Sequence, residues 1–410
     1  MQIYAAETES FCQKHGIHGT QASKAWAQFV EQGLPTKKWP HWHYSNLARL
    51  LKTAYTPDQT AANAPARLTQ LPFATYDIVL RNGQFDAQAS TVPNGVKIQS
   101  IRDLAAPQFA AYVTQLDTQR HPMLNANLAL ASDGVYIEVQ SQQCIDRPIC
   151  LRYVIEPDAA HLAYHYHNVV ACQAQSQCEI LEYVEACTDQ PTLLNSATQF
   201  HLQDNAQLTA YATSTNAQHL AHINAWHSWL GRDAHFNAHH LCLGNAMSRF
   251  DGQIYLPETG AHYQHYGAFS LQDKQHADFA FQVDHLADHT SSQIDFRGIA
   301  QDQATGIFNA RALAKQNTKR LSIDQSSHNL LLSPKAKIYA QPALEIYTDD
   351  LVCTHGATVG QLDADALAYL QLRGIPQEAA RQILQQAFLQ NNVLTLANDA
   401  IQKWWLQWIT

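Results

Sequence analysis

The chain has 410 residues, of which 46% are hydrophobic and 15% charged, and its formal charge is −9. This composition excludes a disordered protein, and the acidic balance argues against a nucleic-acid binder, which needs a basic face. No apolar run approaches the roughly 18 residues of a membrane span, and the N-terminus lacks a secretion signal, so we expect a cytoplasmic protein without a membrane partner. Single cores rarely exceed about 250–300 residues, so we expect several domains or an elongated repeat.

The first part of the chain, residues 1–130, is predicted to form a mainly helical domain with a short β insertion. A helix over 21–32 has apolar residues at helical spacing and ends at Gly33, a natural stop. Two β signals, at 76–80 and 96–98, each lie next to an Asn-Gly turn.

From 131 to 352 short strands replace the helical period, and a small residue repeatedly opens a strand directly after a turn. Most of these positions recur at intervals near 27 residues, and they are Cys178, Ala206, Ala234, Ala261, Ala277, Ala304 and Ala336. The pattern favours a parallel β-solenoid, because each coil buries its inner face only on the next and a bulky side chain does not fit the corner. The alternative is an antiparallel sandwich, whose strands recur every 8–12 residues or so and need tighter hairpin turns.

After residue 352 the pattern is helical again, and we expect a C-terminal helical domain over 353–410. Asp363 is a predicted helix N-cap, and the sequence Arg-Gly-Ile-Pro at 373–376 is typical of a helix end, a glycine stop and a new start. The tryptophan-rich end of the chain has a bulky apolar face that must pack against other residues.

Two stretches near the ends of the chain carry a family resemblance. The segment 344–360, Leu-Glu-Ile-Tyr-Thr-Asp-Asp-Leu-Val-Cys-Thr-His-Gly-Ala-Thr-Val-Gly, resembles the SufB/SufD family of iron–sulfur assembly scaffolds, as do Leu-Gln-Leu-Arg-Gly-Ile at 370–375 and Gly-Leu-Pro-Thr-Lys-Lys at 33–38. His-Gly-Ala-Thr-Val-Gly at 355–360 is similar to the SufD branch, whereas SufB has a His-Glu-Ala-Thr type of sequence there. The SufB cysteine proposed to build clusters would align near His328, where this chain has no thiol, and the chain is short for a SufB.

The resemblance implies a mainly β protein with a right-handed parallel β-helix core between helical N-terminal and C-terminal domains. It also implies a non-catalytic scaffold subunit of the SufBCD iron–sulfur cluster assembly complex, which contacts a SufB-type paralogue and docks a SufC-type ABC ATPase. The sequence contains no Walker A loop, so we expect no nucleotide on this chain. The isolated chain could also form a homodimer, because an unpaired strand edge seeks a partner.

Cys353 and His355 are the candidate metal ligands. They are two residues apart in a predicted strand, so their side chains point the same way. A thiolate and an imidazole suit iron or an iron–sulfur cluster. Two ligands cannot complete a site, and the family places its transient nascent cluster at the junction of the two paralogues, so the resemblance implies that the partner subunit supplies the rest.

The resemblance also directs the region 363–376 toward contact with the ATPase. The apolar stripe that follows, over 380–388, could equally do no more than cap the solenoid. The residues expected to bind the partner are Asp363, Leu367, Leu370, Arg373, Gly374 and Pro376.

One hypothesis is independent of the resemblance. His235 and His262 are 27 residues apart, one coil, and both should point outward. Stacked coils bring equivalent residues to about 4.8 Å, close enough for two imidazoles to share a metal ion. The alternative is a solvated histidine ladder, because exposed histidines seldom have a complete ligand set.

Two other functions remain open. The first is a SufB-type cluster scaffold of the same family, which a stable cluster on the isolated chain would favour. The second is a β-helix carbohydrate-active enzyme, which needs a carboxylate cluster on one sheet face. Asp349 and Asp350 are adjacent and therefore point to opposite faces of a strand, which does not favour such an enzyme.

Overall fold

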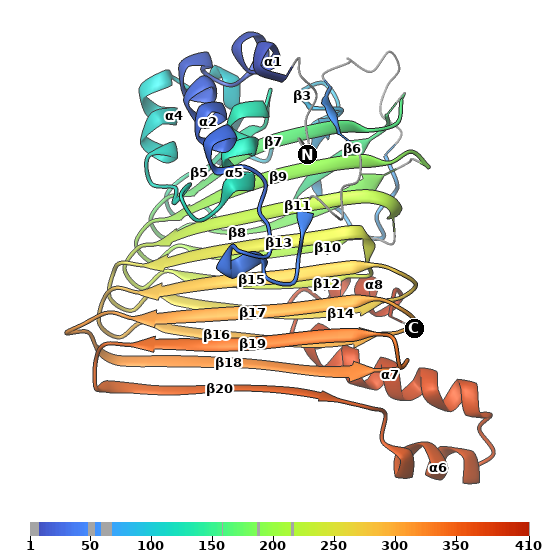
Figure 1. The fold of residues 1–410 in the computed structure, drawn as a ribbon. Helices are drawn as coiled ribbons and strands as arrows, with labels where there is room; N and C mark the ends of the chain where they lie inside the picture. Colours follow the sequence, from blue (N-terminus) through green and yellow to red (C-terminus); the bar gives the residue numbers. More distant parts are fainter. Residues whose placement is uncertain are drawn as a thin grey trace.

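A computed structural model describes residues 8–47, 54–58, 68–157, 159–186, 189–214 and 217–409. A parallel β-solenoid forms the centre of the molecule, with helices toward both ends of the chain (Figure 1). The prediction of a mainly β protein with a parallel solenoid between helical segments is confirmed. None of the helices within the described ranges is long and apolar enough to cross a membrane.

The solenoid consists of two ten-stranded sheets, and from β5 to β20 successive strands of the chain alternate between them. The first sheet contains β19 (Lys337–Ile346), β17 (Thr305–Ala314), β15 (His276–His285), β13 (Asn245–Leu256), β11 (Ala217–Leu230), β9 (Thr192–Leu202), β7 (Leu162–Cys172), β5 (Val135–Val139) and β4 (Val96–Ser100), in this order, with β1 (Thr56–Pro57) paired to β7. The second sheet contains β20 (Asp350–Gly360), β18 (Lys319–Leu331), β16 (Ser291–Ala300), β14 (His262–Leu271), β12 (His235–Cys242), β10 (Gln207–Ser214), β8 (Gln177–Ala186), β6 (Ile149–Ile155), β2 (Tyr76–Arg81) and β3 (Gln84–Asp86).

The strand register gives the length of a coil directly. In the second sheet the residues aligned side by side are Gln177, Gln207, His235, His262, Ser291 and Ser322, so that one coil takes 27 to 31 residues. The predicted interval of about 27 residues is therefore the shortest of the coil lengths that the structure shows. Ala206, Ala234 and Ala261 are fully buried and directly precede strands of the second sheet, as predicted. Ala304 and Ala336 instead precede β17 and β19 of the first sheet, so the sequence pattern combined two different corners.

The six corners that lead from the first sheet to the second between β7 and β18 also contain a left-handed backbone. The φ angles are between 52° and 74°, at Gln175, Asn205, Asp233, Gly260, His289 and Asn317. Glycine, asparagine and aspartate adopt this conformation more easily than other residues, which explains why they occupy several of these turns.

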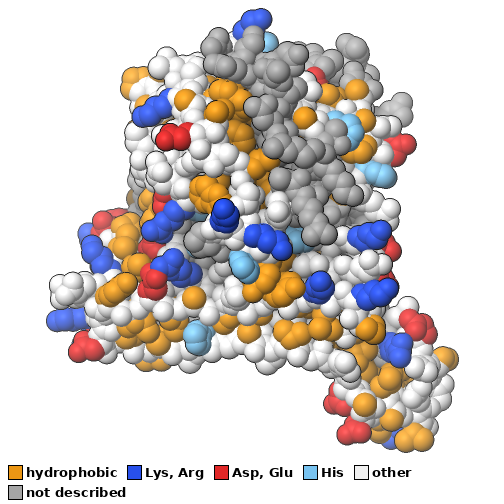
Figure 2. Space-filling view, in the orientation of Figure 1, with side chains coloured by type: hydrophobic (Ala, Val, Ile, Leu, Met, Phe, Trp, Pro, Cys, Tyr) orange, Lys and Arg blue, Asp and Glu red, His pale blue; other side chains and the backbone are white. Residues whose placement is uncertain are grey.

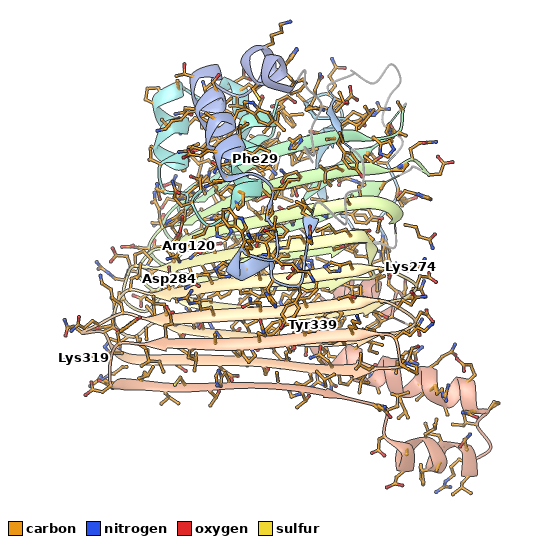
Figure 3. All side chains as sticks on the ribbon, in the orientation of Figure 1. Phe29, Arg120, Lys274, Asp284, Lys319 and Tyr339 are labelled. Atoms are coloured by element: carbon orange, nitrogen blue, oxygen red, sulfur yellow. The ribbon has the colours of Figure 1, made fainter. Side chains whose placement is uncertain are left out.

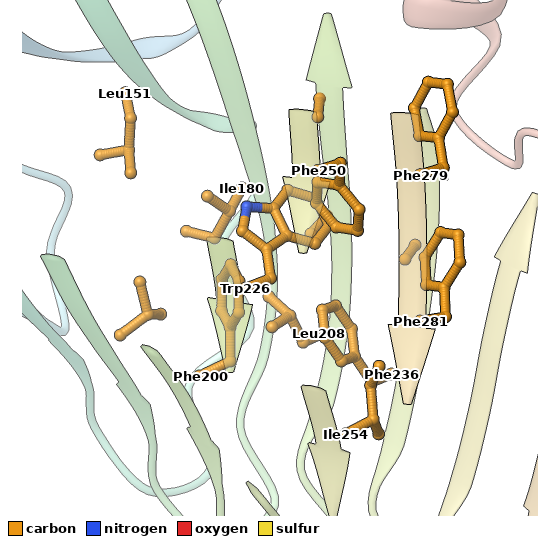
Figure 4. Packing of buried hydrophobic residues seen from close by; sticks show 14 of the residues in the cluster. Leu151, Ile180, Phe200, Leu208, Trp226, Phe236, Phe250, Ile254, Phe279 and Phe281 are labelled. Atoms are coloured by element: carbon orange, nitrogen blue, oxygen red, sulfur yellow. The ribbon is translucent and has the colours of Figure 1, made fainter. Parts of the chain in front are cut away.

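Aromatic side chains fill much of the solenoid interior (Figure 4). The rings of Phe250, Phe279, Phe281, Phe296 and Phe308 contact one another with centroids 5.1 to 6.0 Å apart. Burying one such side chain stabilises the fold by about 1.5–3 kcal/mol, and stacked coils provide this burial only together.

The N-terminal helices pack on one another and on the first coils. They are α1 (Thr8–His15), α2 (Gly19–Gln32), α4 (Ala106–Val113) and α5 (Pro122–Leu130), with single 3-10 turns η1 (Pro40–Trp42) and η2 (Ile101–Asp103). Helix α2 ends as predicted, at Gly33 with φ 69°. The two predicted β signals form β2 and β4, which are not an insertion in a helical domain: they pair with β6 and β5 and extend the two sheets of the solenoid.

Three helices follow the last strand: α6 (Ala364–Leu372), α7 (Gln377–Val393) and α8 (Asp399–Leu406). The side chain of Asp363 accepts hydrogen bonds from two backbone N–H groups of the first turn of α6, and Gly374 has φ 87°, so both predicted helix signals are confirmed. Helices α7 and α8 pack on the outer face of the second sheet, where the indole of Trp405 donates to Thr213 Oγ1 at 3.0 Å. Helix α6 extends away from the body (Figure 1) and has no buried residue.

Candidate functional site

The two sheets end together at β19 and β20, which form the open end of the solenoid (Figure 1). Within the described ranges each of these strands pairs on one side only, β19 with β17 and β20 with β18. Apolar side chains are exposed along this end, and Figure 2 shows hydrophobic groups along the same lower rim. They include Ile346, Tyr347, Val352 and Val359, with Val352 71% exposed.

Cys353 and His355 both lie in β20, as the sequence predicts for residues of one strand. In the parallel register Cys353 aligns with Ile323 and His355 with Gln325. Ile323 and Gln325 belong to the preceding coil and are buried, at 2% and 1% exposure. Cys353 and His355 therefore occupy the equivalent inward-facing positions of the last coil, which no described residue covers.

The two ligands differ in exposure. Cys353 is partly buried and packs with Leu344 and Leu351 against a small apolar cluster that contains Leu321 and Ile323. His355 is exposed. The thiol therefore has a fixed apolar support, and the imidazole is accessible to an approaching molecule.

The described residues alone do not provide a complete metal site. Across the described part of the chain, no group of three or more His, Cys, Asp or Glu side chains is arranged so that it could hold a metal ion. An iron or cluster that is bound by Cys353 and His355 would need further ligands beyond the described residues, because iron–sulfur clusters are usually held by four protein ligands.

Two family models match the chain. One is described as the SUF system FeS cluster assembly, SufBD core domain, and covers residues 154–388. The other is described as the SufBD protein N-terminal region and covers residues 1–151. The chain belongs to the SufBD family.

Relatives over most of the chain agree with this assignment. An iron–sulfur cluster assembly SufBD family protein of Synechocystis is 26% identical, over 87% of this chain and 82% of its own length. The iron–sulfur cluster assembly protein SufD of Escherichia coli is 23% identical, over 93% and 90%. The SufD of Bacillus subtilis is also 23% identical, over 88% and 86%. This SufBD family chain is thus an iron–sulfur cluster assembly protein with SufD homologues.

The residues predicted to bind a partner lie in and around α6. Asp363 caps the helix and Gly374 ends it, so both have a local structural role. Helix α6 also exposes large apolar groups, with Tyr369 at 56% and Leu372 at 87% exposure. The sequence did not single out these two side chains. Its signal was the largely apolar composition of α6, which predicts a helix that needs to be covered. The other predicted positions, partly or fully exposed, are Leu367, Leu370, Arg373 and Pro376.

His235 and His262 lie side by side in register, as predicted. Their ring centroids are 5.3 Å apart, and His262 Nδ1 is hydrogen-bonded to the hydroxyl of Ser291. Burial lowers the pKa of His262, with a smaller contribution from His235. Since the described residues contain no group of three metal donors, metal binding by this pair stays a prediction.

A buried contact between the N-terminal region and the solenoid was missed by the sequence reading. Residues 39–47, which we call the strap, cross the outer face of the first sheet. Arg249 donates to the backbone carbonyl of His41 at 3.0 Å, and Ser45 donates to Asp278. Near the open end the ring of Tyr44 stacks on Tyr339, with 4.0 Å between the ring centroids. Figure 3 labels Tyr339 on the lower part of the solenoid.

A buried carboxylate inside the solenoid was also missed. Glu182 accepts hydrogen bonds from Thr198 at 2.5 Å, from Asn224 at 2.9 Å and from the indole of Trp226 at 3.0 Å. Burial raises the pKa of Glu182, and these three donors oppose that effect. Glu182 is fully enclosed, so it has no route to a substrate and is best explained as a polar anchor of the core.

Proposed function

We propose that this SufBD family protein is a cytoplasmic SufD-type scaffold subunit, in which Cys353 and His355 bind iron or a nascent iron–sulfur cluster at the junction with a SufB-type paralogue. The observation that carries the proposal is the position of this pair on the open end of the solenoid. The iron and the cluster are cargo in this proposal, held briefly and passed on.

The open end supports the proposed junction on physical grounds. A solenoid needs a cover on its last coil, because that coil otherwise exposes apolar side chains and unpaired backbone groups. The C-terminal helices do not provide it: α7 and α8 pack on the outer face of the second sheet, and α6 extends away. A second protein with the same solenoid architecture could pair with β19 and β20 and cover both. A second copy of this chain would fit the same edge and explain a homodimer in isolation.

The ligand pair supports transient binding. A thiolate and an imidazole from one strand leave coordination positions free for the partner, so neither subunit alone holds the cargo firmly. Separation of the two subunits, or a shift between them, would then weaken the site as a whole and release the cluster.

We further propose a division of the chain into three parts: a mainly helical N-terminal part at residues 1–130, whose strands β2 and β4 extend the sheets of the solenoid, the solenoid core at 131–352, and a C-terminal region at 353–410. Strand β20 spans the boundary between the solenoid core and the C-terminal region, at residues 352 and 353. It therefore links the ligand pair directly to α6, whose exposed apolar residues suit the docking of a SufC-type ABC ATPase. In this proposal the nucleotide is bound by that ATPase and not by this chain.

The decisive experiment is reconstitution of the complex with a SufB-type paralogue and a SufC-type ATPase under anaerobic conditions. We expect His355→Ala to lose cluster assembly, measured as bound iron, sulfide and visible absorbance. Complex formation should be unchanged, because the His355 side chain is exposed and supports no core contact. Cys353→Ser should reduce assembly as well.

The matched control is His219→Ala, which removes another exposed histidine of the solenoid, on β11. Normal assembly by this control together with loss in His355→Ala supports the proposal. Normal assembly by His355→Ala would exclude His355 as a ligand.

A further inference from the structure

A pair of cysteines meets inside the solenoid, far from the open end. Cys172 is the last residue of β7 and Cys178 is the second residue of β8, so the two flank one corner of a coil. Their Sγ atoms are 3.7 Å apart, and the residues are 1% and 2% exposed.

The register shows why these side chains touch. In the following coil Cys172 aligns with Leu202 and Cys178 aligns with Leu208, and both leucines are buried in the same interior cluster. In the preceding coil Val139 occupies the position of Cys172. The corner thus directs two inward side chains toward each other in each coil, and in this coil both are thiols.

We infer that Cys172 and Cys178 form an internal dithiol site that closes to a disulfide when the protein meets a small thiol oxidant such as diamide. The S–H bonds of both cysteines break and one S–S bond forms. The two protons and two electrons pass to the N=N bond of diamide, which becomes a hydrazine. The inference does not depend on the proposed iron–sulfur role of Cys353.

No other thiol–thiol hydrogen bond occurs among the cysteines that the structure describes. Cys150 and Cys242 are buried in separate places, and Cys144 is exposed and contacts the side-chain oxygen of Gln177 at 3.8 Å. Contact between the two sulfur atoms is a precondition for a disulfide, because the S–S bond is only about 2.0 Å long and distant thiols cannot form it without movement of the backbone.

The hydrogen bond between Cys178 and Cys172, together with burial, raises the pKa of Cys178, so little thiolate is present at neutral pH. Reaction should therefore be slow and should accelerate as the pH rises. The oxidant can enter where the turn at 173–176 opens, because Gln175 at its centre is exposed. The closed disulfide would fasten β7 of the first sheet to β8 of the second.

The test uses the folded full-length protein, treated with diamide and then denatured in the presence of a maleimide that blocks all remaining thiols. We expect two thiols to be protected from the maleimide, to map to Cys172 and Cys178, and to be recovered with dithiothreitol. The oxidised protein should also unfold at a higher temperature than the reduced protein.

Cys172→Val should abolish this protection, whereas Cys144→Ser and Cys242→Ser should retain it. If Cys172→Val does not fold, the map of the oxidised wild-type protein decides alone. Two outcomes would overturn the inference: all thiols of the folded protein stay open to the maleimide after diamide treatment, or the protected pair includes Cys144 in place of either cysteine.

Discussion

Arg249 is the most deeply enclosed charge of the strap contact. Its side chain is 0% exposed and lies 2.5 Å from Asp251 and 2.6 Å from Asp278, with its guanidinium 4.2 Å from the centre of the Trp42 ring. Burial alone would raise the pKa of Asp251, but Arg249 beside it holds that pKa below its usual range. The guanidinium of Arg249 therefore favours the charged form of the buried Asp251 carboxylate.

We predict that Arg249→Met lowers the free energy of unfolding by about 3–5 kcal/mol, because it leaves two buried carboxylates without their counter-charge. Urea unfolding followed by circular dichroism measures the change. The matched control is Arg311→Met on the same sheet, which breaks the ion pair with Glu345. These partners are 30% and 33% exposed, so we expect a loss of at most about 1 kcal/mol. Equal losses in the two variants would contradict the role of burial.

Single residues also show how far sequence reasoning reaches. Ala206 and Ala234 were recognisable because a corner has room only for a small side chain, and the fold follows from their repetition. The two-residue spacing of Cys353 and His355 alone predicted that their side chains lie on the same face of a strand. The contact of Ser45 with Asp278 could not be predicted from the sequence, because 233 residues separate the two and no local pattern connects them.

At the scale of elements, the C-terminal helices have two distinct roles. Helices α7 and α8 hold the outer face of the second sheet through Leu389, Val393 and Trp405, all nearly fully buried. Helix α6 buries nothing. A deletion of the whole region would therefore remove core contacts together with the proposed docking surface, and a point substitution on α6 separates the two.

We predict that Leu372→Asp weakens the binding of a SufC-type ATPase at least tenfold, about 1.4 kcal/mol, while the fold is retained. Leu372 is 87% exposed, so the new charge disturbs no internal packing. Isothermal titration calorimetry with the purified ATPase gives the affinity. Leu394→Asp, at the end of α7 and 51% exposed, is the control and should bind normally. Unchanged affinity of Leu372→Asp would remove α6 from the docking surface.

At the scale of the whole molecule, the many histidines of this chain mostly serve the fold. Burial lowers the pKa of thirteen of the described histidines. In seven of them the pKa falls to about 3, at His165, His201 and His240, or to about 4, at His167, His222, His239 and His285. The sequence showed the histidines but not their burial, since a strand position reveals its sheet and side only once the register is known.

These shifts predict acid sensitivity. In the folded protein each of these histidines is neutral, whereas in the unfolded chain it gains a proton below its ordinary pKa of about 6.5. Protonation therefore favours the unfolded chain, and stability is highest above this pH and falls as the pH decreases toward 4. Each buried histidine contributes a slope of about 1.4 kcal/mol per pH unit in this window. Urea unfolding at pH 7.5, 6.0 and 5.0 should show a steep loss of stability. His219→Gln, which removes an exposed histidine, should leave the slope unchanged. A flat profile would contradict the burial of these rings.

The strap also has a consequence for how the chain is made. Its residues, 39–47, leave the ribosome early, but Arg249 is synthesised some 200 residues later and Tyr339 about 300 residues later. The early segment must therefore wait, undocked, until nearly the entire solenoid has been translated. The contact of the strap with Tyr339 therefore forms late, because the surface that receives it exists only when β19 is in place.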